Sequence, residues 1–286
     1  MTTPGDLDSK RSALERILRE MDSVVVAYSG GVDSAYLAVA AHRALGARSL
    51  AVTADSESLS SEQRELAREV ARRFGFPHRL IVTRELDNPL YARNDQDRCY
   101  HCKSELFRHL APLALAEGFA HLVYGLIVDD LTDFRPGHRA AAEAGVRAPL
   151  AEAGLTKEDV RALSRELGLP TADLPASPCL ASRLPFGTPV TLEALRRVER
   201  AEAAVRALGF RELRVRHLGE AARVEIAREE MGRLADAAVR AAVEQAVRSA
   251  GYAQATVDPE GYRRGRLNEA LRLVRVTDRT APQTGI

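Results

Sequence analysis

The segment at residues 29–34, which reads SGGVDS, combines the residue types best suited to binding a phosphate. Apolar residues 24–26 precede it and an apolar stretch at 35–45 follows it, so we expect it to join a buried strand to a helix. Paired glycines let the backbone approach an anion, and a helix N-terminus offers free N–H groups. Asp33 would orient the loop or meet a magnesium ion. The segment lacks the lysine of a Walker-type loop and does not fit G-x-G-x-x-G.

Three cysteines, Cys99, Cys102 and Cys179, form a second group that could do chemistry. Cys99 and Cys102 make a C-x-x-C pair at the start of an expected helix, a pattern shared by zinc, redox and iron–sulfur sites. An odd, sparse set argues against a secreted disulfide scaffold. Three thiols suit a [4Fe–4S] cluster whose fourth iron has no protein ligand, and that iron could hold a sulfide for transfer. Unrelated thiols are the alternative.

Basic side chains provide further candidates. The chain has only three lysines, and Lys103 directly follows the cysteine pair, where a compact charge would suit a phosphate or carboxylate. Arg214 and Arg216 alternate on one face of an expected strand, and Arg264 or Arg266 could complete a site for a second phosphate. A solvated basic strand edge is the alternative interpretation.

The elements that must position these residues alternate between short apolar strands and helices. Expected strands cover residues 24–26, 50–52, 80–82 and 122–124, and expected helices cover residues 9–20, 35–45, 62–74, 102–117 and 160–167. This order predicts an α/β fold, a doubly wound parallel sheet with helices on both faces. The ends of its strands receive ligands, which places residues 53–56, including Ser56, near a bound adenosine.

Five prolines between residues 170 and 189 interrupt the periodicity, and we place a domain junction there. We expect domains at residues 1–185 and 186–286, the second a small α+β module. Its expected elements are a helix at 192–208, strands at 213–215 and 223–226, a helix at 231–249 and a strand at 253–257. Residues 272–286 are expected to form a weakly ordered tail.

Composition sets limits on the possible functions. The chain has 286 residues, 45% of them apolar and 28% charged, which is typical of a folded protein. Its net charge of +1 combines +5 over residues 183–286 with −4 over the remainder, so no nucleic-acid binding is expected. We find no signal peptide and no apolar run long enough to span a membrane, so a cytoplasmic protein without a membrane partner is expected.

The loop resembles the SGGxDS signature of the PP-loop ATP pyrophosphatases, whose sheet belongs to the adenine nucleotide α hydrolase-like type. The whole chain resembles the LarE family, the ATP-dependent sulfur transferases, or sulfur insertases, of nickel-pincer cofactor synthesis. The segments that carry the resemblance are residues 28–34 (YSGGVDS), 133–137 (DFRPG), 182–188 (SRLPFGT), 214–216 (RVR) and 261–266 (GYRRGR).

The resemblance implies a function. Family members adenylate a carboxylate of pyridinium-3,5-biscarboxylic acid mononucleotide and replace it with a thiocarboxylate, using ATP and Mg²⁺ and releasing AMP and pyrophosphate. The small-molecule nucleotide would be the substrate, a homo-oligomer is implied, and the terminal sulfur donor is unknown. The residues implied for ATP are Ser29, Gly30, Gly31, Val32, Asp33, Ser34, Ser56 and Arg135; for catalysis Cys179, Lys103 and Asp33; for the substrate phosphate Arg214, Arg216, Arg264 and Arg266.

The family divides over its source of sulfur. Some members sacrifice one cysteine near the position of Cys179, and others carry three cysteines that are thought to hold a [4Fe–4S] cluster. Cys179 lies offset by one from the sacrificial position, so we favour a cluster held by Cys99, Cys102 and Cys179. The alternatives are Cys179 as a sacrificial donor, a PP-loop tRNA thiolase, an amidotransferase synthetase, and a metal-stabilised nucleotide-binding protein without enzymatic activity.

Overall fold

The computed structural model describes residues 4–131 and 136–263. It divides the chain into two compact units, one ending at Cys179 and the other starting at Leu180. The expected junction at 185/186 lies close to this division, and the roles assigned to the two domains stay predictions.

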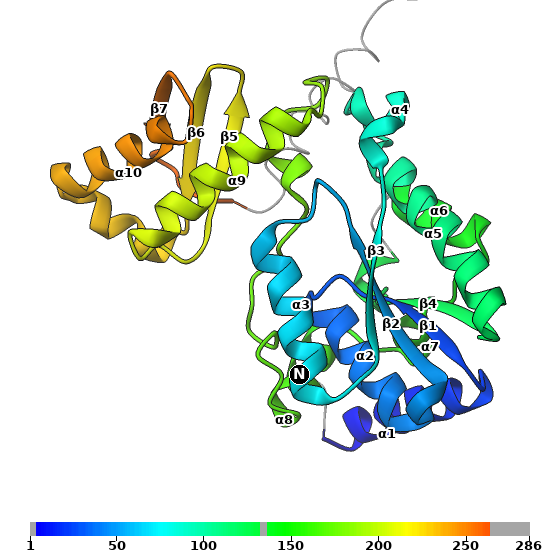
Figure 1. Ribbon diagram of the computed structural model, residues 1–286. Coiled ribbons are helices and arrows are strands. Elements are labelled where there is room, and N and C mark those ends of the chain that lie inside the picture. The colour runs from blue at the N-terminus through cyan, green and yellow to red at the C-terminus, as the bar shows by residue number, and fades with distance from the viewer. Residues whose placement is uncertain (1–3, 132–135, 264–286) are drawn as a thin grey trace, which may run out of the picture. The chain divides into compact units, whose positions relative to one another are not determined.

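Four parallel strands form the sheet of the first unit, in the order β3-β2-β1-β4 (Figure 1). The strands are β1 (Val24–Ala27), β2 (Ser49–Asp55), β3 (His78–Val82) and β4 (His121–Tyr124). After β1, the strands β2 and β3 are added along one edge of β1, and β4 then pairs with the opposite edge of β1. Ligands bind at such a switch point, beyond the carboxyl ends of the strands. The segment at residues 29–34 follows β1 and therefore lies at this point.

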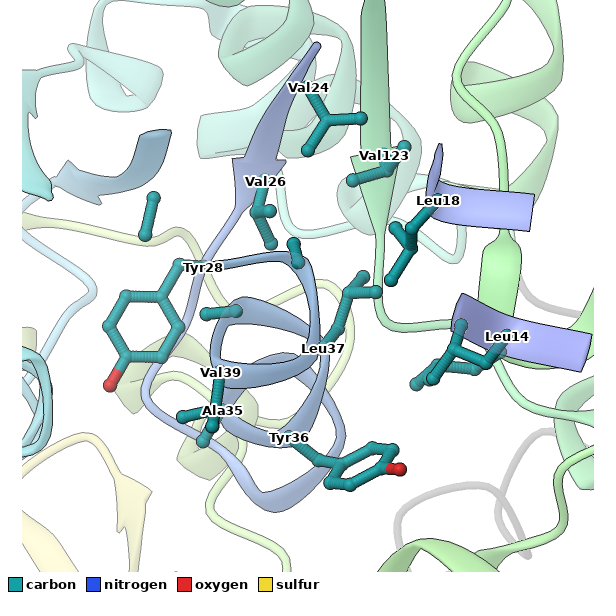
Figure 2. Packing of buried hydrophobic residues seen from close by; sticks show 14 of the residues in the cluster. Leu14, Leu18, Val24, Val26, Tyr28, Ala35, Tyr36, Leu37, Val39 and Val123 are labelled. Carbon is teal, nitrogen blue, oxygen red and sulfur yellow. The ribbon is translucent and has the colours of Figure 1, made fainter. Parts of the chain in front are cut away.

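Successive side chains of β1 point to opposite faces of the sheet. All of them are apolar and buried, so helices must cover both faces. Val24 and Val26 join a buried cluster with residues of α1 and α2 (Figure 2). Residues of α3 and α8 belong to the same cluster. Val25 and Ala27 join another with residues of α5 and α6. These helices are α1 (Pro4–Glu20), α2 (Val32–Leu45), α3 (Ser61–Phe74), α5 (Arg98–Glu117), α6 (Pro136–Glu143) and α8 (Lys157–Glu166). Between them lie η1 (Gly46–Arg48), η2 (Glu85–Asp87), α4 (Pro89–Ala92), η3 (Val128–Asp130) and α7 (Pro149–Glu152).

The second unit has a three-stranded sheet in the order β5-β6-β7, in which β5 is antiparallel and β7 parallel to β6. Residues of both long helices pack with the strands into one buried cluster. Its elements are η4 (Leu180–Arg183), α9 (Leu192–Ala207), β5 (Leu213–Leu218), β6 (Ala221–Ile226), η5 (Arg228–Ala235), α10 (Ala237–Ser249) and β7 (Gln254–Val257).

The expected parallel α/β sheet is confirmed. The expectation of one helix at residues 231–249 is wrong, because the 3₁₀ segment η5 ends before Asp236 and α10 starts after it. The Asp236 side chain accepts a hydrogen bond from the backbone N–H of Ala238 and so begins a new helix. The short helices α6 and α7 were not predicted. The expected tail lies outside the described residues.

Candidate functional site

The loop between β1 and α2 has the geometry of an anion-binding turn. Gly30 has a φ of +75°, and a Cβ at this residue would lie 3.2 Å from the Cβ of Ala67 on α3. Gly31 caps α2 without any side-chain hydrogen bond, so the first N–H groups of the helix remain available to a ligand. The hydroxyl oxygens of Ser29 and Ser34 lie 3.0 Å apart, and the Ser34 hydroxyl also accepts from the Ser29 N–H. These bonds fold the loop into one shape before any ligand binds.

Gly125, just after β4, packs directly against the start of α2. A Cβ at Gly125 would lie 2.9 Å from the backbone nitrogen of Ser34 and 3.1 Å from the carbonyl carbon of Asp33. Both are backbone atoms, so neither can rotate away as a flexible side chain would. The close approach of β4 to the loop therefore requires a glycine at this position.

Asp33 is held by Lys157, the first residue of α8. The Lys157 ammonium donates to both carboxylate oxygens of Asp33, at 2.7 Å and 2.5 Å. Burial raises the pKa of Asp33, and the bond to Lys157 opposes that rise. The backbone N–H of Lys157 donates to Asp129 Oδ2 at 2.8 Å, which fixes the start of α8 beside η3. A lysine thus reaches the loop from a distant helix, although the loop sequence contains none.

The residues expected to lie near the adenosine follow β2. Ser56 is nearly buried, and its carbonyl accepts from the N–H of Leu59. Thr53 donates its hydroxyl to the carbonyl of Tyr28 at 2.7 Å, which ties β2 to the start of the loop. Asp55 is paired with Arg64 of α3. Thr53 and Asp55 therefore hold the framework of the site.

The three cysteines all belong to the first unit, and their charges influence one another. Cys99 is exposed, whereas Cys102 and Cys179 are half-buried. Cys99 lies in the first turn of α5, where the helix dipole favours a thiolate, and Cys102 begins the second turn. Loss of solvation raises the pKa of both thiols, and the charge of Cys179 raises it further. The thiol of Cys102 also lies 3.8 Å from a carboxylate oxygen of Glu85.

A segment of irregular backbone brings Cys179 into this neighbourhood. Arg161 of α8 donates to the carbonyls of Ala172 and Leu174, at 2.6 Å and 2.8 Å. Gln63, in the first turn of α3, donates its side-chain amide to the carbonyl of Ser177 at 2.6 Å. The carbonyl of the same Gln63 lies 3.4 Å from the Cβ position of Gly30. The first turn of α3 therefore links the phosphate loop to the segment that carries Cys179.

Buried polar side chains surround the thiols. Arg98 is 6% exposed and donates to Asn94, and its charge and hydrogen bond lower the pKa of Cys99 against the effect of desolvation. The Tyr91 hydroxyl bonds to Ser58. Burial raises the pKa of Tyr91, and the charges of Cys179 and Cys102 add to that rise. Glu85 is 2% exposed, and its Oε2 has no hydrogen-bond partner in the described part of the chain.

Lys103 and Arg135 are two further candidates for the ATP site, and only Lys103 lies in the described part of the chain. Lys103 lies on α5 with its ammonium 5.9 Å from the centre of the Phe107 ring, and its stem packs where Gly137 leaves room. Its charge lowers the pKa of Cys99 and Cys102, so it acts on the thiols. Arg135 lies outside the described residues.

The expected phosphate-binding arginines lie on β5 of the second unit. Arg214 and Arg216 are 4% and 8% exposed, so a solvated strand edge does not describe them. Arg216 donates to Glu225 at 2.7 Å and to the carbonyl of Ser182 at 3.1 Å. The Arg214 guanidinium lies 5.0 Å from the centre of the Tyr262 ring. Arg264 and Arg266 lie outside the described residues.

Arg183 adds a third buried guanidinium to this region of the second unit. It is 2% exposed and forms two hydrogen bonds to Glu202, at 2.8 Å and 3.0 Å. Burial lowers the pKa of Arg214, and the positive charge of Arg183 lowers it further. Three guanidinium groups thus gather around η4 and β5 with two buried carboxylates, Glu202 and Glu225.

The described residues contain neither a cluster of metal-ligating side chains nor a membrane-spanning helix. No three His, Cys, Asp or Glu side chains among them form a group that could hold a metal ion. None of the described helices is long and apolar enough to cross a membrane.

Comparison with known proteins identifies the family. A protein of Lactiplantibacillus plantarum named pyridinium-3,5-bisthiocarboxylic acid mononucleotide synthase is 35% identical over 266 residues, which cover 93% of this chain and 96% of the relative. The chain belongs to the family of this synthase. The expected membership in the LarE family is thereby confirmed. An uncharacterised protein of Synechocystis sp. is 44% identical over 265 residues, covering 93% of this chain and 99% of the relative.

More distant similarity is concentrated on part of the chain. The family profile described as asparagine synthase matches residues 10–91, which include the phosphate loop. One component of a glutamine-hydrolysing GMP synthase from Archaeoglobus fulgidus is 28% identical over 176 residues, covering 58% of this chain and 55% of that protein. The similarity to these proteins therefore covers only part of the chain, whereas the similarity to the thiocarboxylate synthase covers nearly its whole length.

Two residues of this LarE site were missed by reasoning from the sequence. Neither Lys157 nor Arg98 is among the residues expected at the site. The rarity of lysine was a usable signal, since all three could have been weighed for the loop. No signal marks Arg98 among so many arginines, because only the fold shows which of them are buried.

Proposed function

We propose that this chain is an ATP-dependent sulfurtransferase that converts the carboxylates of pyridinium-3,5-biscarboxylic acid mononucleotide into thiocarboxylates for a nickel-pincer cofactor. The observation that carries the proposal is the 35% identity, over nearly the full length of both chains, to a synthase named for the bisthiocarboxylic product. In the first step a substrate carboxylate oxygen attacks the α-phosphorus of ATP, which forms an acyl-adenylate and releases pyrophosphate. A sulfur nucleophile then attacks the acyl carbon and expels AMP.

The phosphate loop and Lys157 would bind ATP. The N–H groups at the start of α2, the hydroxyls of Ser29 and Ser34, and the dipole of α2 all favour an anion in the loop. Lys157, now on Asp33, would move to a phosphate oxygen when the nucleotide enters. This frees Asp33, whose carboxylate oxygens suit Mg²⁺. When bound, Mg²⁺ would neutralise phosphate charge.

The sulfur would be delivered at Cys99, Cys102 and Cys179. Their interacting charges support one shared site, and three soft thiol donors suit iron in a [4Fe–4S] cluster. When bound, such a cluster would carry the sulfide for transfer. Arg98 and Lys103 would offset the negative charge of the thiolates.

The second unit would bind the phosphate of the substrate. Arg214 and Arg216 lie at alternate positions of β5, and the nearby charge of Arg183 adds to the positive potential around Arg214. Arg264 and Arg266 are proposed as additional ligands. A homo-oligomeric assembly and a cytoplasmic location remain predictions.

The test is an anaerobic assay of the full-length protein with ATP, Mg²⁺, sulfide and the biscarboxylate mononucleotide. We expect one AMP for each thiocarboxylate formed, with both products identified by mass spectrometry. Asp33→Asn should abolish AMP formation, whereas Cys99→Ser should lower thiocarboxylate formation and leave the adenylate. Loss of H₂S from the protein mass would assign Cys179 as a sacrificial donor in place of the cluster. Salt-sensitive binding and thiolation of tRNA, without conversion of the mononucleotide, would contradict the proposal.

A further inference from the structure

Cys179 lies at the end of a segment, residues 172–179, that forms neither helix nor strand. Residues 173–178 are all exposed, so packing against a core does not fix the course of this backbone. Hydrogen bonds to its backbone carbonyls can fix that course. Side chains of two helices donate such bonds, Gln63 of α3 and Arg161 of α8.

Gln63 holds the part of the segment nearest to Cys179. Its side-chain amide donates from Nε2 to the carbonyl of Ser177 at 2.6 Å, two residues before the thiol. The Ser60 hydroxyl donates to Oε1 of the same amide at 3.3 Å and accepts from the backbone N–H of Gln63 at 3.2 Å. The amide is therefore bonded through both its oxygen and its nitrogen, with the nitrogen directed at the segment.

Arg161 holds the start of the segment. Its guanidinium donates from Nη1 to the carbonyl of Ala172 at 2.6 Å and from Nη2 to the carbonyl of Leu174 at 2.8 Å. A planar guanidinium that bonds two carbonyls through separate nitrogens restrains both their positions and the backbone between them. The segment is thus anchored near both of its ends.

The two helices that provide these anchors also contact the phosphate loop. The backbone carbonyl of Gln63 lies 3.4 Å from the Cβ position of Gly30. On α8, Lys157 binds Asp33 and lies one turn before Arg161, so both basic side chains are on one face of the helix. Each helix therefore contacts the phosphate loop with one group and the segment before the thiol with another.

We propose that Gln63 and Arg161 are positioning residues that fix Cys179 relative to the phosphate loop. The inference rests on the proposed function, in which an adenylate formed at the loop must meet sulfur delivered at Cys179. It applies equally to a thiol that binds a cluster and to one that donates its own sulfur. A misplacement of about 1 Å between reacting groups can cost about a hundredfold in rate, so sites on separate segments need a rigid connection.

The test measures how fast iodoacetamide, a neutral reagent, alkylates each cysteine of the full-length protein without metal or nucleotide. Peptide mass spectrometry gives each rate separately. We expect Gln63→Leu to raise the rate at half-buried Cys179 by about three- to tenfold, the scale of one lost hydrogen bond. The rates at Cys99 and Cys102 should stay within twofold of wild type. Glu69→Leu, at an exposed position of the same helix, is the matched control and should change none of the three rates.

A merely structural role for Gln63 would raise all three rates together, because a destabilised first unit exposes every thiol. That result, or a Cys179 rate within twofold of wild type in folded Gln63→Leu, would overturn the inference. If the leucine variant does not fold, Gln63→Glu decides the matter, because it keeps the side-chain length and turns an oxygen towards the Ser177 carbonyl. Its Cys179 rate should rise selectively. Arg161→Met should have the same effect, and an unchanged rate would overturn the role of Arg161.

Single-turnover kinetics separate this inference from the proposed function. With ATP, Mg²⁺, sulfide and the biscarboxylate mononucleotide, Gln63→Leu should release pyrophosphate within twofold of the wild-type rate and form thiocarboxylate about tenfold more slowly. If both rates fall to the same extent, Gln63 acts on the nucleotide site and the inference is wrong. If wild type forms no thiocarboxylate, the proposed function is wrong, while the alkylation rates still decide whether Gln63 positions Cys179.

Discussion

Asp33 lies inside the phosphate loop, where a carboxylate would repel the phosphates of ATP unless a cation stays close. Lys157 provides that cation with two hydrogen bonds. Its side chain is about one-third exposed, so the ammonium can move from the carboxylate to an incoming phosphate without crossing a packed core. In the proposed reaction, the pair would supply a movable positive charge where negative charge develops.

Replacement of Lys157 should therefore impair adenylation with little effect on folding. We expect Lys157→Met to lower kcat/KM for AMP formation by about a hundredfold, the scale found when a preorganised donor is removed. Lys10→Met is the matched control, because Lys10 pairs with buried Asp159 of α8 at 2.8 Å and lies away from the loop. It should cost about 2 kcal/mol in urea unfolding while the folded enzyme keeps its activity. Equal activity in the two variants would contradict the role of Lys157.

The sequence could show which types of residue the site needs, but not which individual lysines and arginines would lie there. Lys103 is predicted from its place beside the cysteine pair, and its charge lowers the pKa of Cys99 and Cys102. Lys157 is 124 residues from Asp33 along the chain, so their contact depends on the packing of α8 against α2. Burial of Arg214 and Arg216 likewise depends on η4, whose Ser182 carbonyl accepts a hydrogen bond from Arg216.

Elements position the site through short contacts between their ends. The first turn of α3 contacts Gly30 through its backbone and holds Ser177 through the side chain of Gln63. The end of β4 contacts the first turn of α2 through Gly125. The alternation of strands and helices predicted the sheet because apolar periodicity reports local structure. It could not predict these end-to-end contacts, or the short helices α6 and α7, which have too few residues to show a period.

Gly125→Ala tests the contact between β4 and the loop. The added Cβ would lie 2.9 Å from the Ser34 nitrogen, so either β4 or α2 must shift and the loop would lose its shape. We expect a loss of about 1 to 3 kcal/mol in unfolding free energy and at least tenfold weaker ATP binding by isothermal calorimetry. Gly5→Ala on α1 is the control, because no atom lies within 4 Å of its Cβ position. Alanine there should preserve ATP binding and match or raise the stability. Undiminished ATP binding by Gly125→Ala would show that the loop tolerates a displaced β4.

At the scale of the whole molecule, the two units differ in how they use charge. The first has its glycine-rich loop and Cys99 at the starts of α2 and α5, where the helix dipole favours negative charge. The second buries guanidinium groups against carboxylates, as in the pair of Arg183 and Glu202. The uneven distribution of charge along the chain was visible in the sequence, whereas burial of the arginines was not, because a count of charges carries no information on packing.

Each unit also contains a histidine shielded from solvent, half-buried His78 in the first and buried His217 in the second, which gives the stability of the chain a dependence on pH. Burial lowers the pKa of His78 in the first unit and of His217 in the second. His78 Nε2 lies 2.9 Å from the Thr53 hydroxyl, whose proton is donated to Tyr28, so His78 Nε2 donates to that hydroxyl oxygen. His217 Nδ1 lies 3.0 Å from the Tyr252 hydroxyl. Both native environments therefore favour the uncharged ring.

Unfolding free energy should fall as the pH drops from 7.5 to 5.5. The unfolded chain binds protons at its histidines near pH 6.5, before the folded chain does, so acid favours unfolding by about 1.4 kcal/mol for each unit of pKa separation. Urea denaturation of the metal-free protein would measure this slope. Burial raises the pKa of Asp33 and Glu85, and their effect has the opposite sign, so the informative quantity is the difference between variant and wild type. The pair His78→Gln and His217→Gln should flatten the slope, whereas His109→Gln, a more exposed histidine, should not. A slope that survives in the double variant would place the proton uptake on other groups.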